Sequence, residues 1–276
     1  MIKQMLVPTD GSEYAAIGVR YAVALAKRYD ATLHGLHVVD IKMLEGPFLR
    51  DVSASLGTAP FVNYQNNISM ILEERGKLAL EVFTNACEAA GVRYETSQVT
   101  GVVARSILDK SELCDLIVMG RGGEHGEWLE GLVGSTTEAV IRRAKQPVLV
   151  TGIDTPGTKR FLVAYDGSAH AKRALQAAAD IGRDWNMPFH VLVVGESRGE
   201  TVVAEARSYL EAHNLEVEFV LTNGDPSEVI VEYAAECEAD LLVMGAYGHT
   251  KVRELVVGST TAYAINHAPC PVLLLR

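Results

Sequence analysis

The chain has 276 residues, of which 48% are hydrophobic and 22% are charged, and its formal net charge is −10. This length predicts about two domains with packed cores, and the negative charge disfavours general binding to nucleic acid or to an anionic membrane, because no basic excess neutralises phosphates. The four cysteines form no CxxC pair, no apolar run is long enough to cross a bilayer and no signal peptide is recognisable, so a reduced, cytoplasmic protein is expected.

Strand and helix patterns alternate along the first half of the chain. Short apolar runs predict strands at residues 5–7, 33–39, 92–99, 116–119 and 147–150. Between them, apolar residues at helical spacing predict one helix after Ser12, its expected N-cap, and others at residues 68–90, 103–112 and 136–143. The stretch 41–67 contains Gly, Pro, Ser and Asn and is expected to be a long loop. Strands separated by helices predict an α/β fold with a parallel, doubly wound sheet.

The second half of the sequence repeats the first. The segment "MLVPTDGS" at residues 5–12 returns as "FLVAYDGS" at 161–168, and "DLIVMG" at 115–120 returns as "DLLVMG" at 240–245. The period is about half the chain, so each copy is expected to be a whole domain of about five parallel strands. The Gly-, Pro- and Thr-rich segment 151–159 is predicted to link the copies, which gives domains at residues 1–152 and 158–276.

The fifth strand of each copy, at residues 147–150 and 271–275, is expected at an edge of its sheet. Two such edges can join antiparallel and thereby pair their free backbone N–H and C=O groups. The two halves are therefore predicted to form an intramolecular pseudo-dimer. Further association into a homodimer stays open.

A glycine-rich segment follows the fourth strand of each copy and leads into a helix. The glycines and the serine that define this segment are Gly120, Gly123, Gly134 and Ser135 in the first copy, and Gly245, Gly248, Gly258 and Ser259 in the second. Glycines let the backbone approach an anion closely, and free N–H groups at a helix start carry partial positive charge. Ser135 also has Glu138 three residues on, which predicts a capping box. These features predict a phosphate cradle, although glycine turns and a helix cap without any ligand would share the pattern.

Two further carboxylates are expected beside these cradles. Asp10 and Asp166 follow the first strand of each copy, and open parallel sheets bind ligands at the carboxyl ends of their strands. Neither GxxxxGK[ST] nor GxGxxG occurs, so the segment is not a Walker-type loop. No His, Ser or Lys completes a catalytic apparatus around the two aspartates, so no catalytic residue is predicted.

These motifs resemble those of the universal stress protein family, and the resemblance covers nearly the whole chain. The family's nucleotide-binding pattern is G-x2-G-x9-G-[ST], with an Asp at the end of the first strand. The second copy has this spacing, whereas the first copy has one extra residue in the long spacer. The resemblance implies two tandem Rossmann-like domains of the adenine nucleotide alpha hydrolase type. It also implies ATP as the ligand, with Mg²⁺ as a candidate companion, and a role as sensor or regulator in the stress response.

By the same resemblance, a set of residues in each half is expected to bind the nucleotide. In the first half these are Thr9, Asp10, Val38, Met119, Gly120, Gly123, Gly134, Ser135 and Thr136. In the second half they are Tyr165, Asp166, Val194, Met244, Gly245, Gly248, His249, Gly258, Ser259 and Thr260. The aspartates and valines are expected beside the adenine, and the glycine loops with their serines around the ribose and phosphates.

Two alternatives to a nucleotide-binding regulator stay open. One is a nucleotide-dependent enzyme, such as a slow ATPase, a ligase or a nucleotidyl transferase; the other is a nucleotide-free interaction scaffold. The protein partner is unknown from the sequence. No metal site is predicted, because His125 lacks the ligand cluster that Zn²⁺ requires.

The two glycine loops differ in charge. The first contains Glu124, Glu127 and Glu130, whereas the second contains Lys251 and Arg253 against Glu254. Carboxylates near a polyanionic triphosphate weaken its binding unless a cation such as Mg²⁺ intervenes. Tighter nucleotide binding by the second half is therefore predicted.

Overall fold

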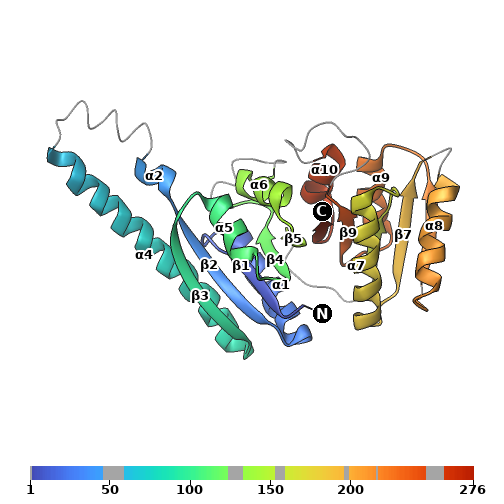
Figure 1. Ribbon diagram of the computed structural model, residues 1–276, viewed down its shortest axis with the longest axis horizontal. Coiled ribbons are helices and arrows are strands. Elements are labelled where there is room, and N and C mark those ends of the chain that lie inside the picture. The colour runs from blue at the N-terminus through green and yellow to red at the C-terminus, as the bar shows by residue number, and fades with distance from the viewer. Residues whose placement is uncertain are drawn as a thin grey trace.

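The computed structural model describes residues 2–45, 59–123, 133–152, 159–195, 199–215, 217–246 and 258–276. In this part of the chain, the strands of both halves form one ten-stranded sheet in the order β3-β2-β1-β4-β5-β10-β9-β6-β7-β8 (Figure 1). The first half supplies β1 (Gln4–Pro8), β2 (Thr32–Asp40), β3 (Arg93–Gly101), β4 (Leu116–Gly120) and β5 (Val148–Thr151). The second half supplies β6 (Phe161–Ala164), β7 (Phe189–Val194), β8 (Val217–Thr222), β9 (Leu242–Gly245) and β10 (Val272–Leu275).

Helices cover both faces of this sheet, and two buried clusters separate sheet from helices. On one face lie α1 (Glu13–Tyr29), α4 (Ala59–Ala90), α7 (Ala169–Trp185) and α8 (Gly199–Glu211). On the other lie α5 (Val103–Ser111), α6 (Ser135–Arg143), α9 (Pro226–Glu236) and α10 (Ser259–His267). Side chains alternate between the faces along each strand: Met5 and Val7 join the first cluster, and Leu6 joins the second. The doubly wound α/β prediction is confirmed.

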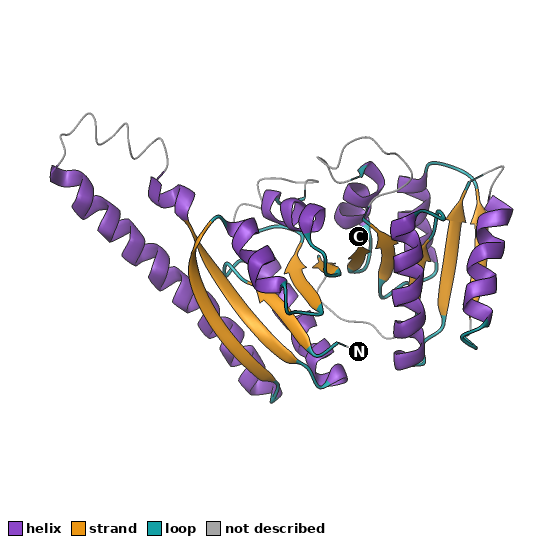
Figure 2. Cartoon of the chain, in the orientation of Figure 1, coloured by secondary structure: helices purple, strands orange, loops and turns teal. Residues whose placement is uncertain are grey.

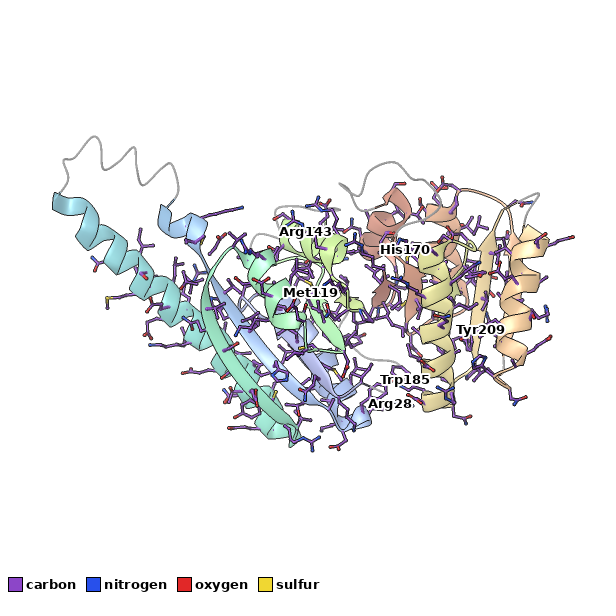
Figure 3. All side chains as sticks on the ribbon, viewed as in Figure 1. Arg28, Met119, Arg143, His170, Trp185 and Tyr209 are labelled. Atoms are coloured by element: carbon purple, nitrogen blue, oxygen red, sulfur yellow. The ribbon has the colours of Figure 1, made fainter. Side chains whose placement is uncertain are left out.

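The two halves join through their fifth strands. β5 and β10 run antiparallel, with Leu149 opposite Leu273, while every other described strand pairing is parallel. The predicted antiparallel junction of the fifth strands is therefore confirmed. The junction is reinforced on one face, where the Arg28 guanidinium lies over the Trp185 ring at 4.6 Å and Trp185 Nε1 donates to the Tyr29 hydroxyl (Figure 3).

The loop predicted over residues 41–67 is wrong at both ends. A short helix, α2 (Ile41–Glu45), follows β2, and α4 begins at Ala59 rather than at residue 68. Pro60 is the second residue of α4, where its missing N–H removes no intrahelical bond, and no glycine occurs at residues 61–75. Each residue added to an existing helix gains a hydrogen bond at little cost. The N-terminal part of α4 consequently extends beyond the β3 edge of the sheet (Figures 1 and 2).

The strand order also determines where a ligand can bind. In the first half, β2 and β3 lie on one side of β1, and β4 and β5 lie on its other side. The crossovers on either side of β1 therefore diverge, which opens a crevice at the carboxyl ends of β1 and β4. No helix within the described residues is long and apolar enough to cross a membrane.

Candidate functional site

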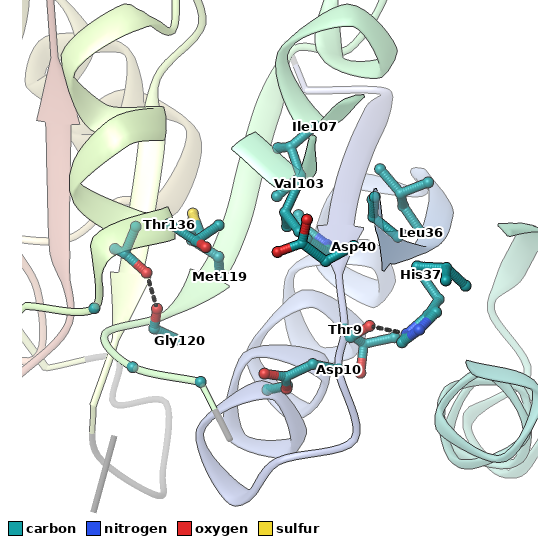
Figure 4. A pocket seen from close by; sticks show the side chains of 18 of the residues that line it. Thr9, Asp10, Leu36, His37, Asp40, Val103, Ile107, Met119, Gly120 and Thr136 are labelled. Carbon is teal, nitrogen blue, oxygen red and sulfur yellow. Dashed lines mark hydrogen bonds between the residues drawn. The ribbon is translucent and has the colours of Figure 1, made fainter. Parts of the chain in front are cut away.

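A cavity of about 300 Å³ lies at the carboxyl ends of β1, β2 and β4, at this point of reversal (Figure 4). Its described walls come from the end of β1, the second half of β2, the glycine loop after β4, the start of α6 and one side each of α4 and α5. Every first-half residue predicted from the resemblance lines it, namely Thr9, Asp10, Val38, Met119, Gly120, Gly123, Gly134, Ser135 and Thr136. The structure thus brings together segments from near the two ends of the first copy, such as Thr9 and Thr136.

One side of the cavity is apolar. Leu36 and Val38 from β2 line it together with Val103 and Ile107 from α5. Met119, at the end of β4, completes this apolar lining, and Figure 4 shows it with Leu36, Val103 and Ile107. Leu36 and Ile107 are each 1% exposed, so their positions are fixed by core packing. A wall of this kind suits the face of a flat, weakly polar ring, because burying that face removes apolar surface from water.

The start of α1 is closed by the protein's own side chains. Ser12 is its N-cap, as predicted, and Ser12 Oγ accepts the Ala15 N–H at 3.2 Å. Asp10 does not cap the helix; its Oδ1 accepts the Ser12 N–H at 3.0 Å in a tight local turn. A Cβ added to Gly123 would lie 2.7 Å from Asp10 Oδ2. The glycine loop therefore lies directly against the Asp10 carboxylate.

The start of α6 is not closed in this way. Its N-cap is Gly134, which offers no side-chain bond, and the helix begins at Ser135. The predicted capping box is therefore wrong: Ser135 is the first helical residue rather than the cap, so Glu138 lies one position too far along to complete the box. The first N–H groups of a helix have no intrahelical partner, and the residues that carry them here, Ser135, Thr136 and Thr137, line the cavity.

The glycine loop is held to the sheet by hydrogen bonds at both ends. The Gly134 N–H donates to the Arg121 carbonyl at 2.9 Å, and Thr137 Oγ1 donates to the Gly120 carbonyl at 3.0 Å. In the second half, Thr261 Oγ1 donates to the Ala246 carbonyl at 3.1 Å. In the repeat, Ala246 corresponds to Arg121 and not to Gly120. The two carbonyl acceptors thus differ by one position, which agrees with the extra residue in the loop of the first copy.

The first glycine of each loop has a packing role. A Cβ on Gly120 would lie 2.6 Å from the Tyr14 carbonyl oxygen, and one on Gly245 would lie 2.8 Å from the Ala171 nitrogen. Real side chains do not tolerate such contacts with backbone atoms. These glycines allow α1 and α7 to approach β4 and β9, whereas Gly123 borders the cavity itself.

The second half repeats several of these features. The start of α7 is capped by Ser168, Asp166 Oδ1 accepts the Ser168 N–H at 2.9 Å, and α10 follows Gly258 without a side-chain cap. Val194 is half-buried at the end of β7, Met244 is buried in β9, and Ser259 and Thr260 form the first turn of α10.

Tyr165 lies differently from its first-half counterpart, Thr9. Its side chain is 3% exposed and belongs to the core under α8, and its hydroxyl donates to Glu205 at 3.0 Å. Burial, reinforced by the Glu205 carboxylate, raises the pKa of Tyr165. Gly248, His249 and the charged residues of both loops lie outside the described residues, so the prediction about loop charge stays a prediction.

Several cavity residues were not predicted from the sequence, and three of them carry ionisable side chains. His37 Nδ1–H donates to the Thr9 carbonyl at 2.9 Å, and Asp40 ends β2 (Figure 4). Arg75, on α4, also lines the cavity. A signal for Arg75 exists in the sequence: the dipeptide Arg-Gly recurs at residues 75–76 and 198–199, at corresponding points of the two copies. His37 has no such signal, because its counterpart in the repeat is a valine.

Comparison with known proteins identifies the family to which this sequence is similar. A model described as the universal stress protein family matches residues 1–152, 157–214 and 194–276. The Universal stress protein Slr1230 of Synechocystis sp. is 31% identical over 287 aligned residues, which cover 100% of both chains. The Universal stress protein MJ0531 of Methanocaldococcus jannaschii is 35% identical over 153 residues, covering 54% of this chain and 82% of the relative.

A solved structure shares the fold over nearly the whole length. It is the crystal structure of a universal stress protein from Archaeoglobus fulgidus, with a TM-score of 0.78 and 24% sequence identity. The similarity covers 99% of this chain and 96% of that one. The tandem arrangement of two halves is therefore not peculiar to this sequence.

Proposed function

This chain belongs to the universal stress protein family, and from that membership we propose that it binds an adenine nucleotide, with ATP as the expected ligand. The proposal assigns it the role of a nucleotide-dependent sensor or regulator in the stress response, acting in the cytoplasm. It assigns one site to each of two domains, residues 1–152 and 158–276.

The observation that carries the proposal is the contrast between two helix starts at one sheet edge. Ser12 caps α1, whereas nothing on Gly134 caps α6, and the uncapped start lines the cavity. Free N–H groups together with the helix dipole favour a bound anion, by about 0.3–1 kcal/mol for the dipole on its own. A phosphate group next to Ser135 and Thr136 would supply the missing acceptors.

The rest of the cavity fits the remaining parts of a nucleotide. The apolar wall formed by Leu36, Val38 and Ile107 suits an adenine ring, and Asp10 offers acceptors to ribose hydroxyls or the adenine amino group. A Cβ on Gly123 would fill space beside Asp10, so this glycine keeps the mouth of the cavity open. Ligand pockets in proteins span about 300–1,000 Å³, and the first-half cavity, at about 300 Å³, meets the lower end of that range.

A divalent cation would enter with the phosphates rather than occupy a protein cage. Among the described residues no group of three or more His, Cys, Asp or Glu could hold a metal ion. Mg²⁺ characteristically combines one or two carboxylates with phosphate oxygens and water. Asp10 and Asp40 are the carboxylates that line the cavity.

The test is whether the purified full-length protein carries or takes up nucleotide. Native mass spectrometry should show retained adenine nucleotide, and calorimetric titration of nucleotide-free protein with ATP and Mg²⁺ should show saturable binding. Absence of binding by both methods at millimolar ATP would overturn the proposal in favour of a scaffold. Multiple-turnover release of ADP or AMP that depends on a co-substrate would instead establish an enzyme.

A further inference from the structure

We propose that Arg75, on α4, binds the phosphate groups of the nucleotide in the first half and selects phosphorylated ligands over the nucleoside. The inference rests on the proposed function and assigns a specificity-determining residue to that site. Arg75 lies outside the glycine pattern and comes from a helix on the opposite side of β2 from α5.

Arg75 lies where two cavities adjoin. It lines the main cavity and also a second cavity of about 180 Å³, whose other walls are residues 10–14 and Gly123. Asp10 and Gly123 are shared by both cavities. A phosphate chain that leaves the start of α6 along the glycine loop would pass this shared wall, within reach of a long arginine side chain.

The electrostatics of the site require a cation. Among the described residues that line the two cavities, Arg75 is the only Lys or Arg, and it stands against the carboxylates of Asp10, Glu13 and Asp40. A triphosphate brought near three carboxylates is repelled unless positive charge compensates. Arginine matches phosphate geometry with two parallel N–H donors, so it adds direction as well as charge.

The other arginine near the loop is committed elsewhere. The Arg121 guanidinium donates to the Asn266 carbonyl in α10 at 3.1 Å and lies over the Tyr14 ring at 5.4 Å. It therefore contacts the second half of the chain, and it does not line the main cavity. Arg75 is therefore the arginine that lines the main cavity among the residues that the structure describes.

Close packing of α4 on the sheet holds Arg75 at this place. A Cβ on Gly76 would collide with the His37 ring and would lie 2.8 Å from Gln98 Oε1, so a larger residue would displace these two side chains of β2 and β3 from α4. Gln98 Nε2 also donates to the Glu73 carbonyl at 3.2 Å. The backbone on both sides of Arg75 is thereby fixed relative to the cavity.

The second half has a packing glycine at the corresponding position of its helix. A Cβ added to Gly11 would contact Ala79 in α4, and one added to Gly167 would contact Val202 in α8, so corresponding positions in the two helices differ by 123 residues. The same offset relates Gly76 to Gly199, whose Cβ would collide with Leu221, and relates Arg75 to Arg198. Arg198 lies outside the described residues, but the sequence keeps Arg before the packing glycine in both copies.

The experiment compares ligands and variants on the full-length protein. Calorimetric titrations with ATP, AMP and adenosine, each at low and high salt, are made on the wild type, Arg75→Gln, Arg75→Lys and Lys77→Gln. Lys77 is a matched control, because it is an exposed cation on the same helix whose Nζ pairs with Glu74 at 2.6 Å. Arg75→Gln should weaken ATP binding at one site about tenfold and reduce its salt dependence, while adenosine binding stays unchanged.

The control outcomes separate this inference from the proposed function. Arg75→Lys should fall between wild type and Arg75→Gln, and Lys77→Gln should match the wild type within about twofold. If the wild type binds ATP and Arg75→Gln binds it equally well, the inference is wrong while the proposed function stands. Equal losses for ATP and adenosine would also overturn it, because they would indicate a structural role. Failure of the wild type to bind any nucleotide would overturn the proposed function itself, and this inference with it.

Discussion

Two glycines of the first-half glycine loop have different roles in this protein. Gly120 and Gly123 are both part of the same glycine pattern, yet a Cβ on the first would meet the Tyr14 backbone, and one on the second would meet only the Asp10 carboxylate. Backbone atoms of a packed helix cannot move independently, whereas a carboxylate at the mouth of a cavity can rotate. The two glycines should therefore respond differently to substitution.

We expect Gly120→Ala to reduce stability and Gly123→Val to reduce ligand binding. The first change forces α1 away from β4 and should lower the free energy of unfolding by about 1–3 kcal/mol, the usual cost of overpacking. The second should leave the free energy of unfolding within about 0.5 kcal/mol, as for other changes outside the core, and should remove first-half nucleotide binding. Urea unfolding and calorimetric titration of both variants measure the two effects. A Gly123→Val protein that binds nucleotide as the wild type does would contradict the assignment.

At the scale of elements, the ends of helices decide which of them can receive a ligand. α1 and α7 begin with a serine that caps its own helix, and α6 and α10 begin after a glycine that does not. Within each half, the two helices start after parallel strands, so both starts lie at the same sheet edge of that half. The difference is one of residue type at the N-cap, and it leaves two of the four starts available to an anion.

Serine-to-alanine substitutions should separate these two kinds of helix start. Ser12→Ala removes the bond to the Ala15 N–H and should cost about 1 kcal/mol of unfolding free energy. Ser135→Ala removes no capping bond, so its cost should stay below about 0.5 kcal/mol. Chemical denaturation of both variants without ligand makes the comparison. Equal costs for the two variants would show that Ser135 caps α6 after all.

At the scale of the molecule, the two halves share one sheet and both of its cores. Each buried cluster contains residues from both halves, and Leu149 of β5 lies between Val118 of β4 and Leu273 of β10. Paired edges and shared cores couple the folding of the halves, because neither edge strand can open without exposing apolar surface and backbone groups.

Both halves should therefore unfold in a single transition, and a mutation at the β5–β10 junction should shift the midpoint of that transition for both halves together. Leu149→Ala deletes a side chain that is 4% exposed and should cost about 2–5 kcal/mol. The matched control Leu221→Ala, on the outermost strand β8 and 42% exposed, should cost less than about 1 kcal/mol. In a Trp128→Phe background, Trp185 fluorescence reports on the junction between the halves, and circular dichroism reports on the helices and strands of both halves. Separate transitions, only one of which moves with Leu149→Ala, would show that the halves unfold independently.

Much of this molecule follows from local sequence patterns. The duplication, the order of strands and helices, the Ser12 cap and the pairing of the fifth strands are all encoded by residue periodicity and turn chemistry over short distances. The gathering of Asp10, Gly123 and Gly134 also follows, because parallel strands bring their carboxyl ends to one sheet edge.

Tertiary packing decided what those patterns leave undetermined. Gly134 rather than Ser135 is the cap of α6, Arg121 turns to the other half, and Arg75 reaches the cavity because Gly76 allows α4 to approach β2. Each outcome depends on the distance between segments far apart in sequence, which periodicity within a segment does not specify. The sequence by itself therefore determined the scaffold and the edge at which a ligand would bind, whereas close packing between elements determined which side chains face that ligand.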